Sequence, residues 1–207
     1  MDATLARQSK KSQRTRARIL DEAMRLFAEA GYAAATNAVI AEAAGLTRGA
    51  MLYHFATREA LVEAAVAHID AARAALFEAA ASPAPGVDAA EHAIDAYWAL
   101  LHTPPFLAFA ELEAAARTDP MLRERLAVAA SAFDHGHVGE RFLALSQAGV
   151  DPRFQTSRDL GRFVLEGLAR ATLTYDRDER TARLLRVVKR AVRMLNRKGL
   201  VQELWPE

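Results

Sequence analysis

The chain has 207 residues, of which 52% are apolar and 26% charged, and a formal net charge of +1. This composition is typical of a globular protein and excludes a disordered or fibrous chain. Cysteine is absent, which excludes disulfides and thiolate metal sites. No apolar stretch reaches the roughly 20 residues that cross a bilayer, and residues 1–8 lack the apolar block of a secretory signal. We therefore expect a cytoplasmic protein without membrane contact, built from two domains of unequal size.

The charge is unevenly distributed along the chain. Residues 1–58 contain nine Lys/Arg and five Asp/Glu, a net charge of +4, whereas residues 59–207 contain 18 and 21, a net charge of −3. We interpret the densest basic run as a mobile arm that leads into a helix. The run consists of Arg7, Lys10, Lys11, Arg14, Arg16 and Arg18. Positive charge of this density favours contact with phosphate groups, and a solubilising tail is the alternative.

Helical periodicity runs through almost the whole chain. Apolar residues recur at steps of three and four, and no segment alternates with period two, so the predicted fold class is all-α. A first helix carries an apolar stripe from Ile19 to Ala30 and ends at Gly31, because glycine accepts a left-handed backbone. A short second helix ends in the same way at Gly45. Three threonines are placed to cap the starts of the next helices: Thr36, Thr47 and Thr57.

Prolines divide the rest of the chain, since proline lacks the backbone donor and restricts the preceding residue. The fourth helix runs toward Ala81 and ends before residues 82–86. We expect further helices near 88–103, 105–118, 120–148, 156–175 and 178–198. The total is about nine helices.

The stretch from Ile40 to Phe55 has the pattern of a helix, a tight turn built on Gly45 and a second helix. A helix-turn-helix has this pattern and places its second helix in the major groove of DNA. The residues spaced to face inward are Ile40, Ala44, Leu46, Met51 and Phe55. Those left outside are Thr47, Arg48, Ala50, Leu52, Tyr53 and His54. Arg48 can form a bidentate contact with guanine or bind phosphate, and Gly49 permits close approach of the backbone to DNA. A generic helical hairpin with exposed polar residues is the alternative.

From Thr15 to about Leu61 the chain resembles the DNA-binding domain of TetR-family regulators. The matches fall in one ungapped register and comprise Ile19-Leu20, Ala23, Leu26-Phe27, Gly31-Tyr32, Thr36, Ile40-Ala41, Ala43-Ala44-Gly45, Thr47-Arg48-Gly49, His54-Phe55 and Thr57-Arg58-Glu59-Ala60-Leu61. Since the N-terminal unit ends inside the fourth helix, we expect a domain border within that helix near residue 60: a helix-turn-helix domain over 1–60, with the basic arm, and a helical domain over 61–207. The resemblance implies that the second domain binds the effector and forms the dimer. It also implies a repressor that binds double-stranded operator DNA and is released by an unknown small-molecule effector.

The resemblance implies DNA contacts from Thr36, Thr47, Arg48, Gly49, Ala50, Tyr53, His54 and Arg58. His54 packing against the fourth helix is an open alternative. Two departures from the family pattern matter. Val39 replaces an acidic residue, so Thr36 has no reciprocal capping partner. Leu52 replaces a frequent tyrosine; it is a candidate contact for a thymine methyl group, and the phosphate contact passes to Tyr53.

Aromatic residues and histidines of the larger domain are the candidates for an effector cavity. They are Trp98, His102, Phe106, Phe109, Phe133, His137 and Phe163. A solid core is the alternative for each of them. We expect no metal site, because His135 and His137 point to different sides of a helix, and no cofactor or catalytic site, because no nucleophile is paired with a base. A DNA-binding architectural or protein-regulated factor without a small ligand is the second functional hypothesis. An open apolar pocket beside the fourth helix would favour the regulator.

The last two long helices both carry apolar stripes, and we expect a homodimer through them. The stripes consist of Leu160, Phe163, Val164, Gly167, Leu168 and Ala171 on one helix, and of Leu184, Leu185, Val188, Val192 and Leu195 on the other. Gly161 and Gly167 are expected to let helices cross closely. The basic stripe from Arg183 to Arg197 on the last helix is interpreted as a solvated face.

Overall fold

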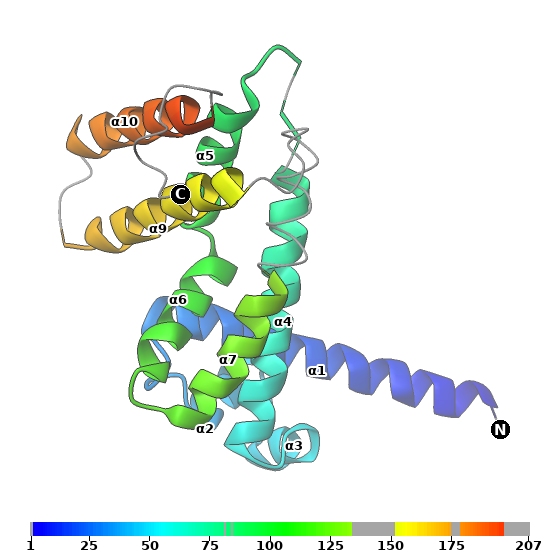
Figure 1. Cartoon of the computed structure of the whole chain (residues 1–207). Coiled ribbons are helices and arrows are strands. Elements are labelled where there is room, and N and C mark those ends of the chain that lie inside the picture. Colours follow the sequence, from blue (N-terminus) through cyan, green and yellow to red (C-terminus); the bar gives the residue numbers. More distant parts are fainter. Residues whose placement is uncertain (1, 81, 84, 134–151, 175–178, 197–207) are drawn as a thin grey trace. The chain divides into compact units, whose positions relative to one another are not determined.

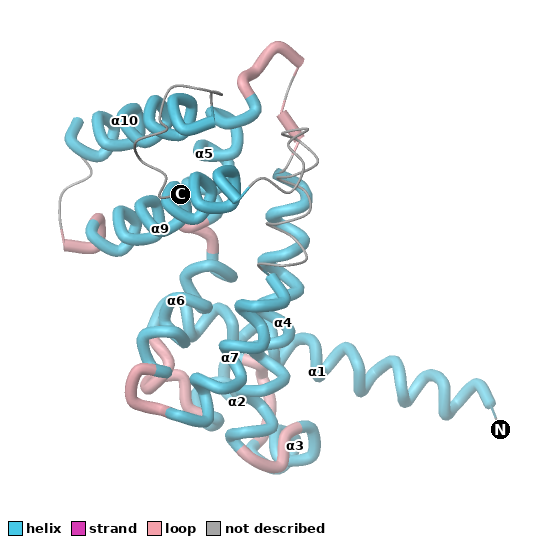
Figure 2. Tube along the Cα trace, in the orientation of Figure 1, coloured by secondary structure: helices cyan, strands magenta, loops and turns pink. Residues whose placement is uncertain are grey.

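The computed structural model describes residues 2–80, 82–83, 85–133, 152–174 and 179–196 (Figure 1). These ranges contain nine helices and no strand (Figure 2), which confirms the all-α prediction. The helices are α1 (Asp2–Ala30), α2 (Asn37–Ala43), α3 (Arg48–His54), α4 (Arg58–Ala80), α5 (Ala89–Leu100), α6 (Pro104–Ala116), α7 (Pro120–Phe133), α9 (Pro152–Ala171) and α10 (Glu179–Asn196).

The predicted stop and start signals are present where they were expected. Gly31 and Gly45 follow α1 and α2 with φ of 84° and 62°, in the left-handed region that glycine enters without a Cβ clash. The Thr57 hydroxyl accepts a hydrogen bond from the backbone N–H of Ala60 at 3.1 Å at the start of α4. The pKa of the Glu59 carboxyl is lowered, because its own backbone N–H and the Thr57 side chain hydrogen-bond to it.

The prolines also lie at helix starts, since α6, α7 and α9 begin at Pro104, Pro120 and Pro152, where a missing N–H costs nothing. The helix expected over 120–148 is described as far as Phe133, and its remaining part lies outside the described residues.

The basic run is part of a helix, so the prediction of an arm that leads into the helix is wrong. Residues 2–30 form one continuous helix. The segment contains no glycine or proline, and alanine, leucine, arginine, lysine and glutamine all favour helix.

Packing divides the chain into two compact units. The first consists of residues 1–75 and 103–133, and the second of residues 76–102 and 134–207. These limits differ from the expected domains, 1–60 and 61–207, because α6 and α7 pack with the N-terminal helices. A DNA-binding domain that ends near residue 60 stays a prediction.

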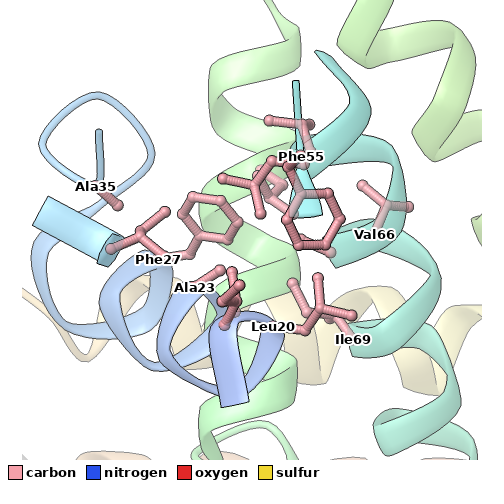
Figure 3. Packing of buried hydrophobic residues seen from close by; sticks show 14 of the residues in the cluster. Leu20, Ala23, Phe27, Ala35, Phe55, Val66 and Ile69 are labelled. Atoms are coloured by element: carbon pink, nitrogen blue, oxygen red, sulfur yellow. The ribbon is translucent and has the colours of Figure 1, made fainter. Parts of the chain in front are cut away.

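The first unit has a continuous apolar core to which α1 contributes Leu20, Ala23 and Phe27, and α4 contributes Val66 and Ile69 (Figure 3). The inward positions predicted for the helix-turn-helix are confirmed: Ile40, Ala44, Met51 and Phe55 are buried, and Leu46 is partly buried. Burial of one large apolar side chain contributes about 1.5–3 kcal/mol, so this core fixes α2 and α3 on α1 and α4.

In the second unit, polar contacts join α5 to α9 and α10. Lys189 of α10 pairs with Asp95 of α5 at 2.6 Å, and the Tyr97 hydroxyl of α5 donates to Glu166 of α9 at 2.7 Å. The close helix crossing predicted at the glycines is present at Gly161, where an added Cβ would lie 3.5 Å from Val192. Within the single chain no such crossing is present at Gly167, where an added Cβ would meet no described atom within 4 Å, and a crossing there in a dimer stays a prediction.

Among the described residues, no helix is both long enough and apolar enough to cross a membrane.

Candidate nucleic-acid interface

The turn between α2 and α3 is fixed by backbone hydrogen bonds. The N–H of Gly45 donates to Glu42 at 2.9 Å, and the N–H of Leu46 donates to Ala41 at 2.8 Å. Both bonds use carbonyls at the end of α2 that have no partner within the helix. At the other end of α2, the Thr36 hydroxyl accepts from the N–H of Val39 at 3.3 Å, so Thr36 caps the helix without an acidic partner, as predicted.

Helix α3 is only seven residues long, and a helix of this length is not stable alone in water. Its start is capped by Thr47, whose hydroxyl accepts from the N–H of Ala50 at 3.2 Å. Its inner side is anchored by Met51 and by the following Phe55, which are 2% and 1% exposed. Caps and packing together hold α3 as a rigid element.

The outer side of α3 is open to solvent, as the spacing predicted. The exposed residues are Thr47, Arg48, Gly49, Leu52 and Tyr53, and Ala50 and His54 are half-buried. Tyr53 is 81% exposed, an unusual position for a large aromatic side chain. An added Cβ at Gly49 would meet no atom within 4 Å, so nothing in the described chain requires glycine there. Contact of these residues with DNA stays a prediction.

His54 is the last residue of α3, and its ring packs edge-on against Tyr53 at 5.2 Å between centroids. Thr36, at the start of α2, is exposed. The neighbouring Val39 is 40% exposed and adds an apolar side chain to the surface of α2.

Arg58 was expected to contact DNA, but its guanidinium is turned toward the protein. One Nη atom donates to the carbonyl of Ala35 at 2.6 Å, and the other donates to the carbonyl of Tyr32 at 3.2 Å. The Arg58 Cζ also lies 4.9 Å from the centroid of the Tyr32 ring, within the range of a cation–π contact. Arg58 therefore ties α4 to the segment between α1 and α2, and this geometry does not favour a DNA contact.

The candidate effector residues of the first unit surround a cation that the sequence analysis missed. The Cζ of Arg73 lies 5.0, 3.7 and 4.2 Å from the ring centroids of Phe106, Phe109 and Phe133. Arg73 is 3% exposed, and its Nη1 lies 3.6 Å from the Asp70 carboxylate. The signal was present in the sequence, because Arg73 continues the apolar stripe of Val62, Val66 and Ile69 at helical spacing.

The other candidate effector residues belong to the second unit. The rings of Trp98 and His102 lie 4.7 Å apart, and His102 Nδ1 is 2.8 Å from the carbonyl oxygen of Trp98. Phe163 of α9 is 63% exposed, and His137 lies outside the described residues. No single compact unit therefore contains all the candidate effector residues that the structure describes.

An apolar groove of about 510 Å³ runs between α9 and α10. It is lined by Leu160, Gly161, Val164, Gly167, Leu168, Ala171, Leu184, Val187, Val188, Ala191 and Val192. Leu160 and Val187 are 52% and 62% exposed, so the face predicted to form a dimer is open in the single chain.

Comparison with known proteins agrees with this geometry. The family model described as "Bacterial regulatory proteins, tetR family" matches residues 19–65, which include α2 and α3. The HTH-type transcriptional regulator TtgR of Pseudomonas putida is 47% identical over 58 residues, which cover 28% of this chain and 28% of TtgR. The chain thus spans little more than a quarter of that relative.

Solved structures extend the likeness to most of the chain. The structure of a TetR-family member from Streptomyces coelicolor aligns with 86% of this chain, and the alignment covers 97% of that structure's chain. The TM-score is 0.63 and the sequence identity is 26%. The structure of the multidrug binding protein EbrR complexed with malachite green aligns with 85% of this chain, and the alignment covers 96% of the EbrR chain. The TM-score is 0.58 and the sequence identity is 26%. The helix-turn-helix part of the chain thus matches the TetR family of bacterial regulatory proteins, and the helical fold of most of the chain is similar to that of a TetR-family structure.

Proposed function

We propose that the chain is a transcriptional regulator that binds specific sequences in double-stranded DNA, with α3 in the major groove. The observation that carries this proposal is the two-sided character of α3. Met51 and the adjacent Phe55 are buried, whereas Arg48, Leu52 and Tyr53 are exposed. A helix fixed from one side and open on the other is the geometry with which helix-turn-helix proteins contact base edges.

The exposed residues of α3 suit different contacts. Arg48 opens the helix and can donate two hydrogen bonds to O6 and N7 of guanine. Leu52 and Val39 offer apolar surface to thymine methyl groups, and the Tyr53 hydroxyl can donate to a phosphate. Thr36, Thr47, Gly49, Ala50 and His54 complete the proposed contact set. Arg58 is left out of it, because both of its Nη atoms donate to backbone carbonyls within the protein.

We further propose that two copies associate through α9 and α10. Apolar residues that are more than 40% exposed line both sides of the groove between these helices: Leu160, Val164, Leu184 and Val187. A two-fold axis along this groove would pair four helices and bury the apolar face. The two α3 helices would then read half-sites about 34–36 Å apart, or a multiple of that distance.

Repression relieved by a small molecule is the proposed mode of control, with the effector bound in the part of the chain after residue 60. EbrR supports this idea, because a structure that covers 85% of this chain is a complex with malachite green. The relatives are described as regulators, and we propose no catalytic reaction. A DNA-binding factor without a small ligand is the competing function.

Selection of binding sites from random duplex DNA tests the proposed function. The purified full-length chain should enrich one sequence with two-fold symmetric half-sites. Binding that is equally strong for all sequences would contradict a sequence-specific regulator.

Titration with malachite green tests the mode of control, because binding can be followed without DNA by the fluorescence of Trp98 and of the other tryptophan, Trp205. Binding that also lowers affinity for the selected DNA would support the repressor. A panel of aromatic and aliphatic compounds that all leave DNA affinity unchanged would favour the competing function.

A further inference from the structure

Arg16 of α1 contacts the C-terminal end of α3. Its Nη1 donates to the backbone carbonyl of His54 at 3.3 Å, and its Cζ lies 4.2 Å from the centroid of the Phe55 ring. Phe55 is buried and is the residue at which the chain leaves α3. A side chain near the start of the protein thus reaches the end of the helix proposed to read DNA.

Arg16 lies on a different side of α1 from the other basic residues of the run. By helical spacing, one side of α1 carries Arg16, Leu20, Ala23 and Phe27, and the last three of these are buried. Arg14 and Arg18 are each two residues away from Arg16 and therefore lie about 200° around the helix. They share that outer side with Lys10 and Lys11. All five side chains, Arg16 included, are exposed, so Arg16 differs from the other four in its side of the helix and in its contacts with His54 and Phe55. Arg16 is thus the basic residue of the run that faces the core side of α1.

The contact meets a physical need of α3. The last four carbonyls of a helix have no partner within it, and a seven-residue helix has few internal bonds to lose. A cation at the C-terminal end is favoured by the helix dipole. The guanidinium also lies over the ring of Phe55, and this cation–π contact joins the end of the helix to its buried anchor.

We infer that Arg16 is a positioning residue that holds α3 in its reading orientation, and that its charge does not bind phosphate. The inference rests on the proposed DNA binding. The basic run then has two roles: the outer residues supply positive charge for DNA binding, and Arg16 holds α3 in position.

The matched pair Arg16→Ala and Arg14→Ala tests this in the full-length protein, since both remove one arginine from α1 but on opposite sides. Affinity is measured for the selected site and for random duplex DNA over a range of salt concentrations. Arg16→Ala should weaken binding to the selected site about three- to tenfold, with little change in binding to random DNA or in the salt slope. Arg14→Ala should weaken binding to both DNAs alike and reduce the salt slope by up to about 0.9. An equal loss on both DNAs, with the slope reduced by about 0.9, would make Arg16 a phosphate contact and overturn the inference.

A second measurement needs no DNA. Hydrogen exchange of the backbone amides of residues 48–56 should be several-fold faster in Arg16→Ala than in wild type, and unchanged in Arg14→Ala. Unchanged exchange in both variants would overturn the inference. If wild type selects no sequence, the proposed function fails, but the exchange comparison still decides the role of Arg16. Should Arg16→Ala unfold, Arg16→Lys replaces it, because lysine keeps the charge and a donor but loses the planar stack.

Discussion

Replacing Arg58 with alanine should destabilise the protein rather than remove a DNA contact. The side chain donates to two backbone carbonyls, at 2.6 Å on Ala35 and 3.2 Å on Tyr32. A hydrogen bond from a charged donor contributes about 1.5–3 kcal/mol, and a carbonyl left without its donor in a buried place adds a desolvation cost. Arg58 is only half-buried, so we expect a total loss of about 3 kcal/mol in the free energy of unfolding.

Thermal unfolding followed by circular dichroism measures this loss. For a chain of this size, about 3 kcal/mol corresponds to a decrease in Tm of about 6–12 °C. Arg48→Ala is the matched control, because Arg48 is an exposed arginine on α3 and its removal should change stability by less than about 0.5 kcal/mol. An Arg58→Ala protein that is as stable as wild type, but whose DNA binding has a salt slope lower by about 0.9, would refute the structural role.

Three further outcomes are expected. Thr47→Ala should cost about 1 kcal/mol of stability through loss of the α3 cap, and an unfolding curve identical to wild type would show that the 3.2 Å cap bond contributes nothing. Deleting residues 1–12 removes three cations and should weaken binding to all DNA sequences. The dependence of log affinity on log salt concentration should become shallower by up to about 2.7. An unchanged slope would show that the N-terminal part of α1 does not contact DNA. Leu168→Glu should give a folded monomer in light scattering, whereas Val128→Glu on the exposed face of α7 should not; a dimer that survives Leu168→Glu would exclude the α9–α10 interface.

Local signals in the sequence predicted the elements that depend on local physics. Gly31 and Gly45 end helices because their backbones must turn into the left-handed region. Thr36 and Thr47 start helices because their hydroxyls satisfy free N–H groups. The exposed side of α3 followed from helical spacing alone once its inward residues were known.

Long cationic side chains were harder to place. Arg16 and Arg58 both occur in a basic, DNA-binding sequence context, yet each turns back onto the protein. Their direction depends on carbonyls and rings that are distant in the sequence, with separations of 38 residues for Arg16 to His54 and 23 for Arg58 to Ala35. A motif gives the residue type at a position and not the partner that its flexible side chain selects.

Packing between distant helices was also beyond the sequence. Helices α6 and α7 join the first compact unit, although they follow α5 in the chain. Phe106, Phe109 and Phe133 therefore surround Arg73 in that unit and were expected in a different domain. The sequence identified aromatic residues that suit a buried site. It did not show which helix each residue would pack against, because that depends on contacts between distant parts of the chain.

Site selection from random duplex DNA, performed in parallel with wild type and Arg48→Ala, tests the central claim that α3 reads base edges. Wild type should enrich a symmetric sequence. Arg48→Ala should retain that sequence but lose the preference at one base pair in each half-site, because one bidentate contact accounts for about 1–3 kcal/mol of discrimination. The claim would be contradicted if Arg48→Ala, Leu52→Ala and Tyr53→Ala each enriched the wild-type sequence with an unchanged preference at every base pair.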